Sequence, residues 1–252
     1  MIPTAMIVSL GYALILILIM GILLKKGIVG KRIVTAVTLM TLMVGGLLLG
    51  GVPDPVSQFL QIFRGLALGN VPIIPVIGLS LLIVITLIAG RLFCGYACPL
   101  GAVQELMSRC TEQKISMDKL HPRWIRGIFT IVVAVVAFFV PFVTLVNPFR
   151  FFDLQFIPVV TIIFVGVAII SIFIYRPWCQ LLCPFGAISE LASRYSIFRL
   201  RRKPECIDCD QCVRVCPTNQ PVPRGSMSEC YLCGRCIDAC PKDSLAYSRK
   251  DA

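Results

Sequence analysis

Eight cysteines in the last quarter of the chain repeat one spacing twice, and their thiolates are suited to hold metal clusters. The first run reads C-I-D-C-D-Q-C-V-R-V-C-P from Cys206, and the second reads C-Y-L-C-G-R-C-I-D-A-C-P from Cys230. Both follow C-x2-C-x2-C-x3-C-P, the spacing of paired [4Fe–4S] clusters, in which three cysteines of a run bind one cluster and the fourth binds the other. The spacing therefore predicts two clusters, each held by four cysteines. The first quartet is Cys206, Cys209, Cys212 and Cys240, and the second is Cys230, Cys233, Cys236 and Cys216.

A zinc site and a disulfide framework are the alternatives for these cysteines. Zinc commonly takes four ligands in two pairs, whereas two identical quartets fit cubane clusters better. Pro217 and Pro241, which follow the runs, end any helix and turn the chain back. Clusters also need free thiolates, so the 13 cysteines of the chain indicate a reducing compartment rather than a secreted, disulfide-bonded protein.

A second set of cysteines lies in a longer internal repeat. Residues 91–109 read R-L-F-C-G-Y-A-C-P-L-G-A-V-Q-E-L-M-S-R, and residues 176–194 read R-P-W-C-Q-L-L-C-P-F-G-A-I-S-E-L-A-S-R, with ten of 19 positions identical. A C-x3-C pair on a helix places both sulfurs on one face, one turn apart. Together the copies supply four thiolates, which favours a third iron–sulfur cluster or another soft metal site over redox-active dithiols or plain packing. These four residues are Cys94, Cys98, Cys179 and Cys183.

Charged residues occupy matching positions in the two copies. Arg91 and Arg176 are suited to neutralise thiolate charge, and Glu105 and Glu190 to pair with arginines of the repeat. Helix ends that reach toward water, or surface ion pairs, explain the same residues equally well. The thirteenth cysteine, Cys110, has no counterpart in the second copy and is interpreted as incidental.

The composition indicates a membrane protein. Residues of the hydrophobic set make up 57% of the chain and charged residues only 15%, with a mean hydropathy of +0.87. Five apolar segments are long enough to cross about 30 Å of hydrocarbon. We therefore predict a polytopic α-helical membrane protein with a C-terminal α+β domain that carries the two clusters. The predicted spans are residues 5–24, 33–52, 73–93, 128–147 and 155–175, and the two domains are residues 1–198 and 199–252.

The positive charge fits membrane topology rather than nucleic-acid binding. The net charge is +11, yet 22 of the 24 lysines and arginines lie on one side of the predicted spans. Cytoplasmic loops carry such an excess, so the N-terminus is predicted outside and the cysteine-rich domain in the cytoplasm. The basic stretch R-L-R-R-K-P from Arg199 is expected to touch anionic headgroups or an acidic donor protein.

The segments between the predicted spans contain three further features: an amphipathic stretch, an aromatic loop and a histidine. The apolar periodicity of residues 53–72 predicts a short interfacial helix. The aromatic loop 147–153 is interpreted as interfacial anchoring, with a resting place for a quinone head or an external partner as the alternative. A single histidine, His121, is interpreted as solvated, and the chain lacks the paired histidines of b-type haem and the C-x-x-C-H of c-type haem.

With both cysteine sets considered together, the chain resembles the NapH/MauN type of polytopic membrane ferredoxin. It is also similar to the membrane and ferredoxin parts of NosR and CcoG proteins. The resemblance is carried by R-x-[FW]-C-x3-C-P-x-G-A given twice, followed by the two ferredoxin-type runs. It implies electron transfer between a cytoplasmic or quinone pool and a partner at or across the membrane. The chain departs from the pattern in having five predicted spans where four are expected, and no S-G-A-T-type flavinylation site is present.

The expected function is a membrane-anchored iron–sulfur electron-transfer subunit of a respiratory or redox complex. Its partners would be other subunits of that complex and a soluble donor or acceptor, with a quinone as a further electron carrier. No Ser–His–Asp set, P-loop or zinc-protease motif is present, so any enzymatic role is that of a redox subunit. The alternatives are a CcoG-like metalloreductase or metal-centre assembly factor, and a scaffold whose clusters are structural.

Overall fold

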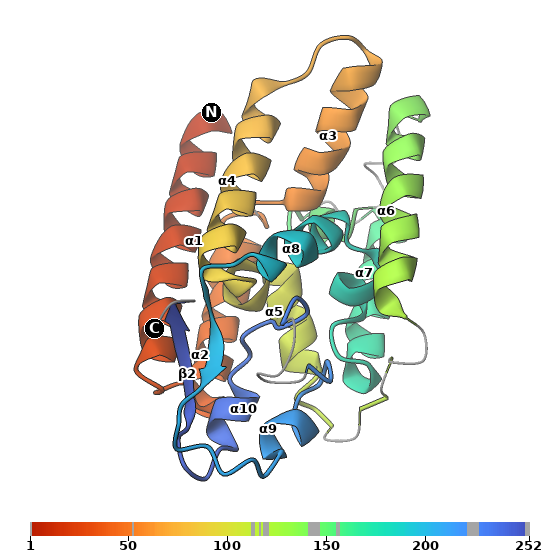
Figure 1. The fold of residues 1–252 in the computed structure, drawn as a ribbon. Helices are drawn as coiled ribbons and strands as arrows, with labels where there is room; N and C mark the ends of the chain where they lie inside the picture. Colours follow the sequence, from red (N-terminus) through yellow and green to blue (C-terminus); the bar gives the residue numbers. More distant parts are fainter. Residues whose placement is uncertain are drawn as a thin grey trace.

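The computed structural model describes a largely helical chain with one small sheet. It covers residues 2–51, 53–111, 114–115, 117, 121–140, 147–154, 157–220 and 227–249, with side chains from residue 8 onward. The longer helices run side by side, and the two strands gather with the short helices α9 and α10 at one end (Figure 1). The cysteine-rich part of the chain thus lies against the end of a helical bundle.

Each of the five predicted spans contains a helix. Three helices of the described residues are long and apolar enough to cross a membrane, and two further apolar helices are shorter. Many of their large apolar side chains are exposed, as expected for surfaces that face lipid. The three long ones are α1 (Ile2–Lys25), α2 (Lys31–Met40) with its π-helical continuation η1 (Thr41–Leu48), and α6 (Pro122–Phe139); the shorter ones are α4 (Ile73–Ala89) and α7 (Pro158–Phe173).

The fourth predicted span overlaps helix α6 in part, and residues 141–146 of that prediction lie outside the described residues. The helix α6 begins at Pro122 and ends at Phe139, whereas the sequence predicted residues 128–147. Proline is favoured at the first helical position, because its missing N–H would be unpaired there anyway. The early start brings Arg126 into the helix, and its side chain is fully buried although neighbouring apolar residues are exposed.

The predicted short helix between the second and third spans is confirmed as α3 (Pro55–Ala67). It packs against α4 and α6. Asp54 caps it, since one carboxylate oxygen accepts hydrogen bonds from the backbone N–H groups of Val56 (2.9 Å) and Ser57 (3.0 Å). The other oxygen accepts from the side-chain amide of Asn147.

The aromatic loop does not anchor the protein at an interface in the way predicted. Residues Pro148–Phe151 form a short 3-10 helix, η5, and Phe149 and Phe152 are only 3% and 2% exposed. The ring of Phe152 lies so close to Gly46 that a Cβ atom there would approach it to 2.9 Å. These two aromatic side chains therefore fill the protein interior.

The C-terminal part contains a two-stranded antiparallel sheet of β1 (Phe198–Arg202) and β2 (Leu245–Arg249). The basic stretch from Arg199 was not recognised as a strand, although Leu200 is its buried centre and pairs with Tyr247. The sheet attaches to the end of α4, where the Tyr247 hydroxyl donates to the carbonyl oxygen of Ala89 at 2.9 Å.

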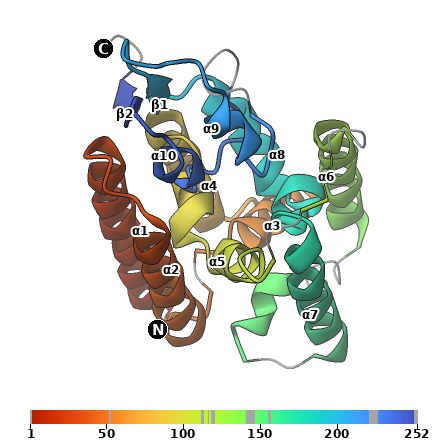
Figure 2. The same cartoon turned by 90° about the horizontal axis from the view of Figure 1, so that it is seen from below.

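The two copies of the internal repeat have the same order of elements. In each, a short π-helical turn holds the first cysteine and an α-helix begins at the proline after the second. Seen from the end that carries the strands, α5 and α8 lie between α1 and α2 on one side and α6 and α7 on the other (Figure 2). The elements are η2 (Phe93–Ala97) and α5 (Pro99–Met107) in the first copy, and η6 (Trp178–Leu182) and α8 (Pro184–Arg194) in the second.

The cap of α3 gives a stability prediction. Asp54→Ala removes the capping oxygen and is expected to lower the free energy of unfolding by about 1 kcal/mol, whereas Asp54→Asn keeps the cap and costs less. Burial raises the pKa of Asp54 from 3.8 to about 6, so the folded state binds this proton more tightly than the unfolded chain. The stability contribution of Asp54 is therefore highest in acid and falls as the pH rises from 3.8 to about 6.

Thermal unfolding in detergent between pH 4 and pH 7 measures both effects. The Asp54→Asn protein should lack this part of the pH dependence. An Asp54→Ala protein as stable as the wild type at both ends of the range would contradict the capping role.

Candidate iron–sulfur centres

The two cysteine quartets paired from the sequence line two separate cavities in the C-terminal module. All four cysteines of each quartet contribute to one cavity and none to the lining of the other. The described residues contain no group of three or more His, Cys, Asp or Glu placed to hold a single metal ion. A cubane makes a different demand, because each thiolate binds its own iron atom at a separate corner. The four-thiol lining of each cavity fits this kind of group.

The loops that carry the two runs adopt the same backbone conformation at matching positions. The second residue after the first cysteine is left-handed in both, Asp208 and Leu232, with φ of 52° and 55°. So is the residue after the second cysteine, Asp210 and Gly234. These turns curl each loop around its own sulfurs. A leucine rarely adopts this conformation, and Leu232 keeps it within a fully packed environment, at 3% exposure.

Backbone N–H groups point at the sulfurs. Gln220 donates to the Cys216 sulfur at 3.4 Å, and Ser244 donates to the Cys240 sulfur at 3.3 Å. Burial raises the pKa of the Cys230 thiol, and a backbone hydrogen bond from Leu232 opposes this rise. Buried thiols of this kind become thiolates when a metal replaces the proton, and amide hydrogen bonds then stabilise the charge.

The cysteines of the two C-x3-C-P motifs are buried in the bundle, each between 6% and 7% exposed. Burial raises the pKa of the Cys98 thiol, and the nearby sulfurs of Cys179, Cys94 and Cys183 raise it further, so the four thiols lie within electrostatic reach of one another. The amide of Gln104 donates to the Cys179 sulfur at 3.3 Å. The structure therefore brings the two motifs together.

The C-x3-C segments are not the regular α-helical turns that the sequence predicted. The second cysteine of each copy has an extended backbone, with φ/ψ of −79°/117° at Cys98 and −81°/116° at Cys183. The residue before a proline is disfavoured in the helical region, which explains both conformations. The N–H of Cys98 instead bonds the carbonyl of Phe93 (2.9 Å), and that of Cys183 bonds Trp178 in the same way.

Because these N–H groups bond a carbonyl five residues back instead of four, some backbone carbonyls of the turns lack helical partners. Buried arginine side chains donate hydrogen bonds to these carbonyls. In an α-helix the carbonyls of Cys94 and Gly95 would accept from residues 98 and 99, but the first N–H is diverted and Pro99 has none. Arg176 of the second copy donates to both carbonyls, at 2.9 Å to Gly95. Arg91 of the first copy crosses in return to the carbonyl of Gly186 at 2.7 Å. The second copy thus supplies the donors for the released carbonyls of the first, whereas Arg91 binds a carbonyl in the first turn of α8.

Arg91, Arg176 and Glu105 lie in interior ion pairs, so the surface alternative is wrong for them. Arg194 is exposed and pairs with Glu190 at 2.7 Å, as that alternative expects. Arg91 and Arg176 are 1% and 0% exposed, and Glu105 is 0% exposed. Glu105 pairs with Arg176 at 3.2 Å and with Arg235 of the cysteine module at 3.2 Å. Although burial opposes it, these arginines lower the pKa of Glu105 to about 2. His121 is exposed, as the sequence indicated, and Cys110 is exposed as well.

The sequence analysis did not identify three residues that contact the predicted cysteine sites: Arg126, Glu229 and Tyr231. Glu229 directly precedes Cys230 and pairs with Arg91 at 2.7 Å and with Arg126. Arg126 was counted only as a loop charge, and it also donates to the carbonyl of Cys179 at 3.2 Å, the group left free in the second copy. An arginine one turn inside an apolar helix is the signal that could have identified it.

Tyr231 connects the cysteine module to the repeat. Its ring lies between two guanidinium groups, 4.5 Å from Arg91 and 5.0 Å from Arg176, as cation–π contacts. Its carbonyl oxygen lies so close to Gly95 that a Cβ atom there would come within 2.5 Å. The residue after Cys230 is thus in direct contact with the turn that holds Cys94.

Removal of the Glu229 charge tests this network. Glu229→Gln leaves the buried guanidiniums of Arg91 and Arg126 without their shared carboxylate, and the free energy of unfolding should fall by about 3 kcal/mol or more. Glu205→Gln is the matched control, because Glu205 is an exposed carboxylate of the same module. Thermal unfolding of the detergent-solubilised protein measures both changes. Equal midpoints for the two variants would contradict an essential buried pair.

Two family models match the chain. A model described as a 4Fe-4S binding domain matches residues 71–131 and 156–205, which include both C-x3-C-P motifs. A model described as a 4Fe-4S dicluster domain matches residues 189–249, which include both ferredoxin-type runs. No solved structure matches the chain.

Curated relatives match along part of their own length. YccM of Escherichia coli K12, whose name describes it as a candidate electron transport protein, is 31% identical over 67% of this chain and 54% of its own. NirI of Paracoccus denitrificans is 30% identical over 54% of this chain and 22% of its own. The methylamine utilization ferredoxin-type protein MauN of Methylobacillus flagellatus is 26% identical over 52% and 50%. The chain thus spans about half of YccM and MauN and a smaller part of NirI.

The regions matched by the family models, the two four-cysteine cavities and the apolar helices all fit a membrane-associated iron–sulfur protein. They combine iron–sulfur domains with helices long and apolar enough for a membrane. The chain belongs to the NapH/MauN type of membrane-associated ferredoxin proteins.

Proposed function

We propose that this chain is a membrane-anchored iron–sulfur electron-transfer subunit of a redox complex. Its two [4Fe–4S] clusters are held by the quartets named above, one cluster in each cavity. The observation that carries the proposal is that cysteines paired by spacing alone line the same cavity in both cases. The names of YccM and MauN, which refer to electron transport and to a ferredoxin-type protein, point the same way.

The two clusters differ in their surroundings, which suggests their order in a relay. The cavity of the first quartet lies in the module's outer loops, and Cys209 is exposed. The second quartet lies against the bundle: Cys236 is buried, and its cavity is also lined by Tyr175, two residues after the end of α7. The first cluster exchanges electrons with a soluble partner, and the second passes them toward the membrane helices.

The twin C-x3-C-P site is proposed as a third metal centre that continues the relay. Its four buried thiols lie within electrostatic reach of one another, and the matched 4Fe-4S binding model includes all of them. Tyr231, which follows Cys230 in the sequence, contacts the turn that holds Cys94. A quinone or a cofactor of a partner subunit would then receive the electrons, since clusters at one face are separated from the other by about 30 Å of hydrocarbon.

The proposed topology follows the distribution of charge. Residues 1–198 form the membrane domain with five spans and the N-terminus outside, and residues 199–252 form the cytoplasmic module. Three arginines must be left out of this charge count, because they are buried in ion pairs and do not act as surface charges. They are Arg91, Arg126 and Arg176. The remaining basic residues still lie overwhelmingly on the same side.

Iron and acid-labile sulfide counts test the number of centres. Two cubanes give about eight iron atoms per chain, and a third cubane gives about twelve. Cys94→Ser and Cys179→Ser should each lower the iron content, whereas Cys110→Ser, which alters the unmatched cysteine, should leave it unchanged. A content of about eight that neither variant changes would overturn the third centre and leave the other two in place.

Anaerobic potentiometric titration followed by electron paramagnetic resonance tests the electron-transfer role. The clusters should be reduced and reoxidised reversibly within the physiological range of potentials, and Cys212→Ser should remove one signal while Cys110→Ser removes none. Clusters that cannot be reduced in this range would indicate a structural role and overturn the proposal. Pull-down in mild detergent then identifies the partner subunits.

A further inference from the structure

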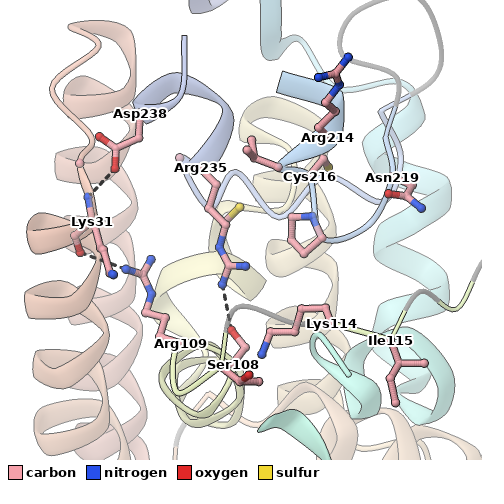
Figure 3. A pocket seen from close by; sticks show the side chains of 16 residues that line it. Lys31, Ser108, Arg109, Lys114, Ile115, Arg214, Cys216, Asn219, Arg235 and Asp238 are labelled. Atoms are coloured by element: carbon pink, nitrogen blue, oxygen red, sulfur yellow. Dashed lines mark hydrogen bonds between the residues drawn. The ribbon is translucent and has the colours of Figure 1, made fainter. Parts of the chain in front are cut away.

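A cavity of about 560 Å³ lies where the repeat meets the cysteine module. Its walls come from the start of α2, the end of α5 and the loops around Cys216 and Cys233 (Figure 3). Pockets that hold small molecules usually measure about 300–1,000 Å³. The cavity is therefore large enough for an organic ligand and much larger than a simple inorganic anion requires.

The cavity is strongly basic. Of the described residues that line it, five carry positive charge and one carries negative charge. Burial lowers the pKa of Lys114, and the nearby Arg235 charge lowers it further, which shows that the cations crowd one another. The basic residues are Lys31, Arg109, Lys114, Arg214 and Arg235, and the acidic residue is Asp238.

The carboxylates near these cations already have other roles. Asp238 accepts a hydrogen bond from the backbone N–H of Lys31 at 3.0 Å and so caps α2. Glu105, behind the wall, is shared between Arg109 (3.1 Å) and Arg235 (3.2 Å) and also pairs with Arg176. One carboxylate that serves three guanidiniums leaves positive charge in excess. An anionic group in the cavity would compensate that excess.

The other wall of the cavity belongs to the second quartet. Cys216 and Cys233 line it, together with the apolar surface of Val215 and Pro217. Figure 3 shows the charged ends of Arg109, Lys114 and Arg235 on one side, and Cys216 on the other. A ligand that spans the cavity would thus have an anionic end on the cations and an apolar end beside the cysteines.

We propose that this cavity binds a flavin nucleotide of the flavin mononucleotide class, with its phosphate on the basic side and its ring beside Cys216 and Cys233. The inference rests on the proposed function, because it places the ring next to the second cluster. A quinone has no charge for the cations, and a nicotinamide transfers hydride, whereas a cluster takes single electrons. A flavin has both the phosphate and the one-electron chemistry. In this position a reduced flavin gives two electrons, one at a time, to the clusters and two protons to water, leaving oxidised flavin.

Titration of flavin mononucleotide into the full-length, cluster-containing protein in detergent tests the proposal, with quenching of flavin fluorescence as the signal. Riboflavin, which lacks the phosphate, should bind at least about tenfold more weakly. Binding should weaken as salt is added. Inorganic phosphate should compete only at far higher concentrations than the flavin nucleotide.

Variants of the basic side locate the site. Lys31→Gln and Lys114→Gln should each weaken binding by about tenfold, since each removes one charge from the phosphate side. Lys31→Gln keeps the backbone hydrogen bond to Asp238. Arg32→Gln is the matched control, because Arg32 is the exposed neighbour of Lys31 on α2 and does not line the cavity.

Several outcomes would overturn the inference: equal binding of riboflavin, phosphate competition at equal concentration, or no effect of Lys31→Gln. Absence of flavin binding to protein with a full iron content, or capture of an acidic electron-carrier protein in its place, would overturn it and leave the proposed function intact. Flavin binding that depends on Lys31 in protein whose clusters cannot be reduced would uphold the cavity assignment while the proposed function fails.

Discussion

The structure depends on the burial of three guanidinium groups between the two copies of the repeat. A buried charge is tolerated only when it is paired and fully hydrogen-bonded. Arg126 and Arg176 donate to carbonyls that the C-x3-C-P turns have released from helical pairing, and Arg91 donates to the Gly186 carbonyl in α8. All three also pair with carboxylates, which come from Glu105, Glu190 and Glu229. The prolines therefore create free carbonyl acceptors, and the arginines supply the hydrogen-bond donors.

This arrangement also fixes the cysteine module against the helices. Glu229, Arg235 and Tyr231 belong to the second ferredoxin-type run or its approach, and each contacts an arginine or a glutamate of the repeat. The first run has an ion pair with strand β1 instead, between Asp208 and Arg202. The two quartets share their local backbone but differ in burial, because only one of them lies on the charged interior of the bundle.

The parts of the structure set by local spacing could be predicted from the sequence, and the parts set by distant partners could not. The cysteine pairing depends on loops of two and three residues, and the apolar helices depend on unbroken runs of apolar side chains. Both features could therefore be predicted from the sequence. Arg126 and Glu229 lie 103 positions apart, and nothing near either residue indicates the other. The strand β1 was missed because four basic residues in R-L-R-R-K suggested a surface, although the apolar residues at 198 and 200 alternate as a strand requires.

The contacts of Glu229 have a consequence for biogenesis. A ribosome makes Arg91 and Arg126, respectively, 138 and 103 residues before it reaches the Glu229 carboxylate that both of them bind. Until then the nascent helical bundle contains guanidinium groups that cannot be dehydrated at an acceptable free energy. Closure of the helical bundle must therefore wait for the module that contains Glu229, so residues translated later take part in completing an interior built by earlier ones.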